Sequence, residues 1–147
     1  MRPPRRAVLS ASFLGALMPW RLARAQAAPP AFAAHVDTLA PGAVALGIDG
    51  RLFGQAPPPV RRLIDQGCTW LDRQGGQPFA ALGVDARERI LAAAAAAPPN
   101  TLPRVFFDVT RAEVMTLYYS HPASWRALGL AGPPQPDGHP DHARPPG

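Results

Sequence analysis

Cysteine is almost absent from this chain, since Cys68 is the only one in 147 residues. A single cysteine cannot close an internal disulfide. It also excludes a C-x-x-C redox pair, a haem-attachment motif and a cysteine-ligated iron–sulfur cluster built from this chain alone. Because a free cysteine behaves as a small apolar residue, we predict a buried thiol at Cys68. A bond to a cysteine of another chain is the alternative.

Motifs of nucleotide, metal and nucleophile chemistry are missing as well. The sequence contains no G-x-G-x-x-G, no P-loop, no H-E-x-x-H and no G-x-S-x-G. The nearest approach to a metal site is DGHPDH, in which His139 and His142 stand on either side of a proline. That spacing matches no strong metal site. His35 and His121 stand alone and are predicted to be surface or capping histidines. We therefore predict no catalytic residue, cofactor or metal in this chain.

Lysine is also absent, so all 15 positive side chains are arginines, against 10 acidic side chains. Five arginines lie in the first 24 residues, and the other ten balance the ten acidic residues. The net charge of +5 therefore belongs to the N-terminal segment and is not the electrostatic footprint of a nucleic-acid-binding domain. We predict no nucleic-acid partner.

The N-terminal segment has the order basic, apolar, small that is typical of a secretory signal. Arg5 and Arg6, followed by Val8 and Leu9, fit the R-R-x-apolar-apolar pattern of twin-arginine export. That route carries proteins across a membrane after they have folded. An ordinary secretory signal with two adjacent arginines is the alternative.

The apolar run 7–20 is too short for a membrane anchor, because its fourteen residues extend over about 21 Å of helix against a hydrocarbon core of roughly 30 Å. Ala23 and Ala25 supply the small-x-small pattern that signal peptidase cuts. We expect residues 1–25 to be a cleaved signal peptide.

The remaining chain has helical periodicity and almost no strand pattern. Clusters of proline separate the expected helices, which are 31–38, 57–74, 85–97, 103–120 and 122–128. Asp49-Gly50 is a turn signal, and Asp85 with Glu88 forms a variant of the capping box. The alanine run 92–97 has high helix propensity and either lets another backbone approach closely or is filler.

These patterns predict an all-α protein with a single domain. We expect a small, irregular helical domain over residues 26–130 and a proline-rich, extended tail over residues 131–147.

Aromatic residues gather in the last long helix and just after it, as Phe106, Phe107, Tyr118, Tyr119 and Trp125. So many large side chains predict that this helix is buried on more than one side. The aromatics have two interpretations. They are either the core of a small domain or anchors for a partner, because aromatic side chains are enriched at protein interfaces.

The stretch FFDVTRAEVMTLYYSHPASWRALGLAGPPQPDGHPDH resembles the C-terminal part of gluconate 2-dehydrogenase subunit 3. The similarity rests on FF at 106–107, YS at 119–120, Trp125, LG at 128–129 and GPPQPDG at 132–138. The upstream pieces LIDQGCTWLD and PFAALGVDARERIL look like the middle helices of that family.

The resemblance implies a small subunit without a redox centre. Its partner is a large subunit that carries FAD and oxidises a sugar, a sugar acid or a polyol, often with a cytochrome c subunit. The twin-arginine translocase would export the pair to the periplasm, where the small subunit would meet the inner membrane only through the complex. The residues expected to bind the partner are Phe106, Phe107, Tyr118, Tyr119, Trp125, Pro133, Pro134 and Pro136.

Two other classes of protein stay open at this point. One is a free-standing periplasmic helical protein that binds a ligand or acts as an export chaperone. The other is an enzyme in its own right, which would need a pocket with convergent polar groups.

Overall fold

The computed structural model describes residues 27–127 and 129–130, and every regular element in that part of the chain is a helix. In chain order these are α1 (Pro30–Leu39), α2 (Ile48–Gln55), α3 (Pro58–Asp72), the 3-10 helix η1 (Phe79–Ala81), α4 (Val84–Ala96), α5 (Leu102–Ser120) and α6 (Pro122–Ala127). The all-α prediction is confirmed. The predicted signal, 1–25, and the tail, 131–147, lie outside the described residues.

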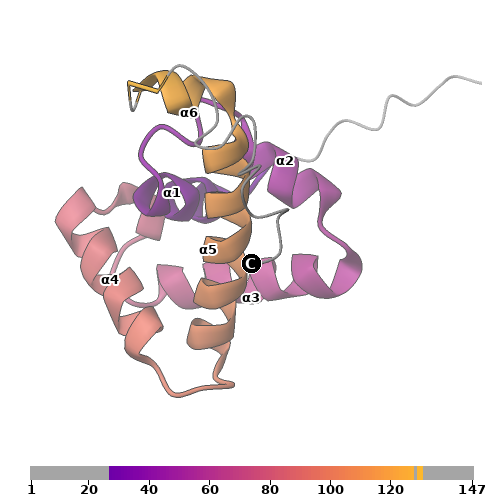
Figure 1. Ribbon diagram of the computed structural model, residues 1–147. Coiled ribbons are helices and arrows are strands. Elements are labelled where there is room, and N and C mark those ends of the chain that lie inside the picture. The colour runs from indigo at the N-terminus through magenta and orange to yellow at the C-terminus, as the bar shows by residue number, and fades with distance from the viewer. Residues whose placement is uncertain (1–26, 128, 131–147) are drawn as a thin grey trace, which may run out of the picture.

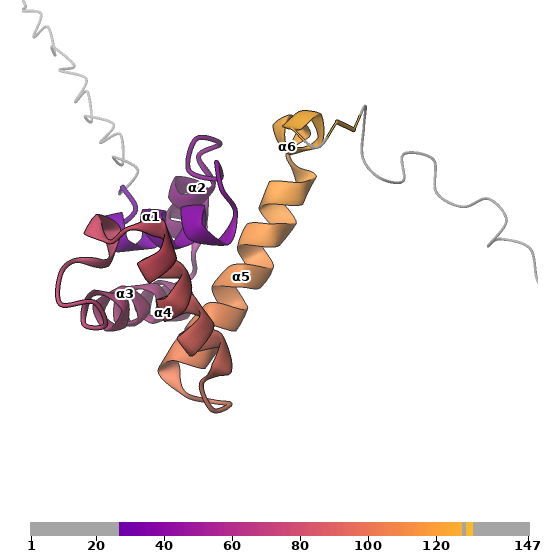
Figure 2. The ribbon, with the colours of Figure 1, turned by 90° about the vertical axis from the view of Figure 1, so that its left-hand side faces the viewer.

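Helices α1 to α4 form a cluster, and the long helix α5 lies along one side of it (Figure 1). Helix α5 contacts all four of these helices, and α6 follows at its C-terminal end, away from the cluster (Figure 2). No helix within the described ranges is long and apolar enough to cross a membrane.

Prolines determine where most of the helices begin. Pro30, Pro58, Pro103 and Pro122 all stand in the first turn of a helix. The amide groups of a first turn have no partner within the helix, so a proline there loses no hydrogen bond. The residue before Pro98 takes the extended conformation that proline favours, and α4 ends there. The proline clusters thus mark the helix boundaries.

Two local predictions from the sequence are wrong. Asp49-Gly50, predicted as a turn, lies inside α2, which begins after Gly47 in the left-handed conformation (φ 71°). Burial of Ile48 and Phe53 stabilises this short helix, and Asp49 in its first turn is favoured by the helix dipole. The turn signal is overridden by packing.

The predicted capping box at the start of α4 is the second error. The N-cap is Gly83, and no side chain makes a capping hydrogen bond there. Asp85 lies two residues inside the helix, where it interacts with the dipole instead of capping the first amides. Within the alanine run only Ala94 is buried and three of the other five alanines are exposed, and the Ala95 carbonyl accepts a hydrogen bond from the Arg104 side chain of α5.

The core lies where α5 crosses α3 and α1. Phe106 of α5 is wholly buried over Gly67 of α3, and a Cβ atom on Gly67 would overlap the Phe106 ring. Phe32 and Val36 of α1 and Leu71 of α3 complete this centre with 0% exposure. The glycine is therefore required by the close approach of the two helices.

Helix α5 is buried on one face only, which corrects the prediction of burial on more than one side. Phe106, Thr110 and Val114 form the buried stripe. The opposite face is exposed at Val105 and Tyr119. Helices α1 to α4 all pack against this one face of α5. The face is therefore wide enough to hold many large side chains, and a second side of the helix does not need to be buried.

Candidate functional site

The expected partner-binding aromatics divide into a core residue and surface residues. Phe106 is wholly buried, with its ring 4.6 Å from the His35 ring, so its prediction as a partner contact is wrong. A phenylalanine that fills the space over Gly67 cannot also reach a partner. Phe107, the next residue, is only half-buried because it points 100° further around the helix.

Tyr118, Tyr119 and Trp125 lie together at the junction of α5 and α6. The Tyr118 and Tyr119 rings meet edge to face at 5.5 Å, and the Tyr118 hydroxyl donates a hydrogen bond to the Pro41 carbonyl at 3.3 Å. The Trp125 indole N–H donates to the Tyr119 carbonyl. Tyr119 is 55% exposed, while Tyr118 and Trp125 are half-buried. The junction therefore holds aromatic rings in fixed positions at the surface.

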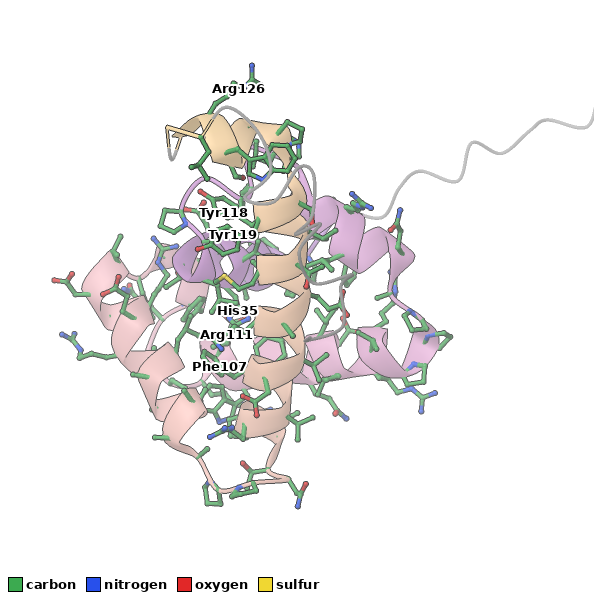
Figure 3. The ribbon with its side chains drawn as sticks, in the orientation of Figure 1. His35, Phe107, Arg111, Tyr118, Tyr119 and Arg126 are labelled. Atoms are coloured by element: carbon green, nitrogen blue, oxygen red, sulfur yellow. The ribbon has the colours of Figure 1, made fainter. Side chains whose placement is uncertain are left out.

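An arginine lies between these aromatics, and sequence reasoning missed it. Phe107, Arg111, Met115 and Tyr118 recur at spacings of four, four and three and so share one flank of α5. With Tyr119 they form a surface that we call the aromatic strip. Figure 3 shows its labelled members following one another along α5. The spacing is visible in the sequence, but the prediction rested on the aromatic residues alone.

The cations near the strip have no partner within the described part of the chain. Arg111 is exposed and makes no hydrogen bond or ion pair there, and the same holds for Arg126 of α6. The described residues form one ion pair, between Arg104 and Asp108 at 2.6 Å. An exposed arginine next to aromatic rings is the residue combination found at the energetic centres of protein interfaces.

Hollows lie between the helices of the described scaffold. The α4–α5 groove has a volume of about 360 Å³ and is lined by Ala92, Ala95, Phe107 and Met115, with Glu88 and Arg111 exposed beside them. It continues the aromatic strip towards α4. The alanine side chains of α4 leave this groove open.

A second hollow, the α2–α5 groove, lies between α2, α3 and α5 and has a volume of about 430 Å³. Its lining includes buried Phe32, Ile64 and Thr110 and the exposed charges Arg51 and Glu113. None of the residues predicted to bind a partner belongs to it.

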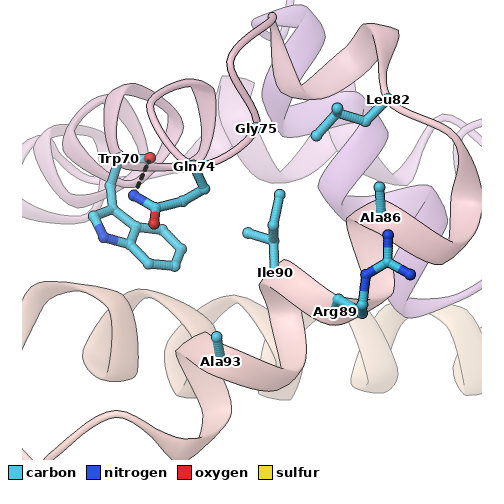
Figure 4. Close-up of a pocket in the computed structure, with 8 residues that line it drawn as sticks. All are labelled: Trp70, Gln74, Gly75, Leu82, Ala86, Arg89, Ile90 and Ala93. Atoms are coloured by element: carbon cyan, nitrogen blue, oxygen red, sulfur yellow. Dashed lines mark hydrogen bonds between the residues drawn. The ribbon is translucent and has the colours of Figure 1, made fainter.

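A third hollow, the α3–α4 cleft, has a volume of about 360 Å³ (Figure 4). Trp70 of α3 and Gln74, just after that helix, stand on one side of it, and Arg89 and Ile90 of α4 on the other. The Gln74 side-chain amide donates to the Trp70 carbonyl at 3.1 Å. Arg89 has no hydrogen bond or ion pair to a described residue.

A buried polar pair joins α1 to α5. The His35 Nε2 atom lies 2.7 Å from the Thr110 hydroxyl, which itself donates to the Phe106 carbonyl at 2.7 Å. His35 is fully buried, which corrects its prediction as a surface or capping residue, and burial lowers its pKa to about 3. Its Nδ1 atom has no hydrogen-bond partner. The imidazole is neutral at ordinary pH and ties the two helices together.

The predictions made for His121 and for Cys68 are both confirmed. His121 is the C-cap residue of α5, and its Nδ1 atom accepts a hydrogen bond from the Ala123 amide at 3.2 Å, so the capping role is confirmed. Cys68 is a buried free thiol, as predicted. Burial, with the charges of Asp72 and Asp65, raises the pKa of Cys68 to about 12, so the thiol stays protonated and unreactive.

Several predicted residues lie outside the described ranges. They are Arg5, Arg6, Val8, Leu9, Ala23, Ala25, Pro133, Pro134, Pro136, His139 and His142. Among the residues that are described, no group of three or more His, Cys, Asp or Glu side chains is placed to hold a metal ion.

Comparison with known proteins gives one result. The family model described as gluconate 2-dehydrogenase subunit 3 matches residues 32–132, which takes in almost the whole helical scaffold from α1 to α6. Neither a curated protein nor a solved structure matches the chain. A match over this length shows the relationship that the sequence resemblance predicted, and the chain belongs to the gluconate 2-dehydrogenase subunit 3 family.

Proposed function

We propose that this chain is the non-catalytic small subunit of a periplasmic, FAD-dependent dehydrogenase complex. Membership of a family of dehydrogenase subunits carries the proposal. In this proposal FAD is bound by the large subunit, and the small subunit supplies structural support and the export signal. A cytochrome c subunit then passes electrons to the membrane, and this chain meets the membrane only through the complex.

The aromatic strip supports contact with the large subunit. Tyr119 and Arg111 are exposed, and the rings around them are held by packing and hydrogen bonds. A fixed ring loses little conformational freedom when it binds, so such residues contribute strongly to affinity. In the proposal Phe107, Tyr118, Tyr119 and Trp125 face the large subunit, and Phe106 stabilises the scaffold behind them.

Export explains why so small a chain has two adjacent arginines at its N-terminus. A flavoprotein folds around its cofactor before it crosses the membrane, and a large subunit without its own signal depends on a bound partner. Arg5 and Arg6 would direct both chains to the twin-arginine translocase. The pair would then reach the periplasm already assembled.

The test is a pull-down of the full chain, tagged at its C-terminus, from the periplasm of its source cells. We expect a yellow eluate with a flavin absorption spectrum and a second band of dehydrogenase size. Replacing Arg5 and Arg6 by lysine should leave both chains in the cytoplasm. A colourless eluate with a single band would overturn the stable complex and favour a free-standing periplasmic protein.

A further inference from the structure

The aromatic strip alone offers little apolar area to a partner. The large hydrophobic side chains that are exposed in the described ranges are Val44, Val84, Val105, Tyr119 and Leu130. They are scattered, and only two of them lie on α5. A stable interface buries about 800 Å² on each partner. A subunit that stays bound therefore needs a second contact region with more apolar surface.

The α2–α5 groove adds further apolar surface, on the flank of α5 opposite the aromatic strip. Phe32, Ile64 and Thr110 form its floor and are all buried, with at most 3% exposure. Half-buried side chains from α2, α3 and α5 form its walls; these are Leu52, Val60, Val109 and Leu117. The groove is thus an apolar channel between helices.

The α2 wall is held firmly against α3. The Arg61 guanidinium of α3 lies 4.3 Å from the centre of the Phe53 ring, and it also donates a hydrogen bond to the Phe53 carbonyl in the last turn of α2. This contact combines a cation–π interaction with capping of a helix C-terminus. The groove is consequently formed before anything binds to it.

Two opposite charges stand on opposite walls of the groove. Arg51 belongs to α2 and Glu113 to α5; both are exposed, and neither makes a hydrogen bond or an ion pair to a described residue. A simple anion would be attracted by Arg51 and repelled by Glu113. A simple cation would be repelled by Arg51 and attracted by Glu113. The groove therefore fits an occupant that carries both signs, one on each side of an apolar face.

The backbone of the occupant is also constrained. Most wall residues lie in helices, where amide and carbonyl groups away from the helix ends are already paired. The Thr110 hydroxyl is used by Phe106 and His35. An extended segment would leave its own backbone groups unpaired over an apolar floor, which is costly. A helix satisfies its backbone internally, so it is the element that such a groove accepts.

We propose that the α2–α5 groove binds an amphipathic helix of the flavin-bearing partner chain. This inference rests on the proposed function for the existence of that partner. The apolar face of the helix contacts the half-buried side chains of the walls, above the floor of Phe32 and Ile64. A basic side chain of the helix faces Glu113, and an acidic side chain faces Arg51. The partner chain then contacts both flanks of α5, with this helix in the groove and with other residues at the aromatic strip.

A photo-crosslinking experiment with matched positions tests the occupant. Gln55 lines the α2–α5 groove and Gln74 lines the α3–α4 cleft, and both are exposed. Each is replaced in turn by benzoylphenylalanine in the full, tagged chain, which is then irradiated in its source cells. We expect the probe at position 55 to join a peptide of the flavin chain with apolar residues at helical spacing. The probe at position 74 should not join that peptide.

Charge reversal tests the recognition. Arg51→Glu and Glu113→Arg should each weaken retention of the flavin chain about tenfold, the size expected when one charge pair of an interface becomes repulsive. Arg89→Glu, in the α3–α4 cleft, is the matched control and should leave retention unchanged. Circular dichroism of each variant shows whether the helical fold is kept.

The outcomes separate the two proposals. If the unmodified chain retains no flavin protein, the proposed function fails, and this inference fails with it. If the complex is intact, crosslinks from position 55 to residues 131–147 or to a second copy of this chain overturn the inference alone. So does full retention by both charge-reversal variants together with no crosslink. A crosslinked partner helix together with weakened retention supports it.

Discussion

Phe106 and Arg111 lie five residues apart on α5, yet the first is wholly buried and the second is exposed without a charged partner in the described chain. The inward face of the helix packs over Gly67 and His35 and stabilises the fold. Its flanks carry charges without a partner among the described residues and half-buried apolar residues, which contribute less to stability than the wholly buried ones. Substitutions on the inward face should therefore change the free energy of unfolding, and substitutions on the flanks should change binding.

The largest effect is expected for Phe106→Ala. Removing a buried phenylalanine leaves a cavity, so the free energy of unfolding should fall by about 3–5 kcal/mol. Val105→Ala, at the exposed neighbour, should change it by less than about 0.5 kcal/mol. Chemical denaturation of both variants gives the comparison. Equal losses for the two would show that the inward face is not the stabilising one.

Gly67→Ala should have the next largest effect. The new methyl group would overlap the Phe106 ring, and overpacking of this kind costs about 1–3 kcal/mol. Gly50→Ala in α2 is the matched control, because a Cβ atom there meets nothing within 4 Å. That change should leave stability unchanged or raise it by up to about 1 kcal/mol, from helix propensity. Thermal unfolding of both variants checks the opposite signs.

The buried histidine predicts a loss of stability in acid. The folded state holds the pKa of His35 at about 3, below its ordinary value of 6.5, so the unfolded chain binds the extra proton. The contribution is fully present above pH 6.5 and declines as the pH falls towards 3. At pH 5 the loss from this residue should be about 2 kcal/mol. Denaturation curves at pH 7.5 and pH 5 measure it.

A variant without the buried imidazole isolates this contribution. His35→Leu should lose part of the pH dependence that the unmodified chain shows. If the His35→Leu curve falls as steeply between pH 7.5 and pH 5 as the original, another group is responsible for the acid sensitivity.

The smallest effect on stability and a large effect on binding are expected for Arg111→Glu. An exposed arginine without an ion pair contributes little to folding, so the free energy of unfolding should stay within about 0.5 kcal/mol. Retention of the flavin chain should weaken about tenfold, because the partner's charges would now be repelled. Arg73→Glu, at the end of α3, is the control for a surface charge change. Unaltered retention would remove Arg111 from the interface.

The sequence predicted the elements well because helix signals are local. Helices α3 and α5 match their predicted ranges closely, and Ile64, Cys68 and Leu71 lie buried on one side of α3 at helical spacing. Predictions that rested on one or two residues, without regard to what packs around them, were less accurate. Asp49-Gly50 became helix because Phe53 is buried against residues of other helices.

The candidate site was predictable only in part. The aromatic residues of α5 were identified from composition, but Phe106 and Phe107 are the same residue type, and the sequence could not assign one to the core and one to the surface. The packing of Phe106 over Gly67 decides it. Arg111 could have been identified from the sequence, because it lies at helical spacing from Phe107 and Met115. His35 had no such signal, because its partner Thr110 is distant in the chain.

The all-α class, the helix boundaries at proline and the family follow from the amino-acid sequence, because periodicity, proline chemistry and the family pattern depend on residues that are close together in the chain. The burial of neutral His35, the single buried face of α5, and the position of Arg51 and Glu113 across one groove depend on how the helices pack. These features join residues from separate helices, and only the packing of those helices brings the side chains together.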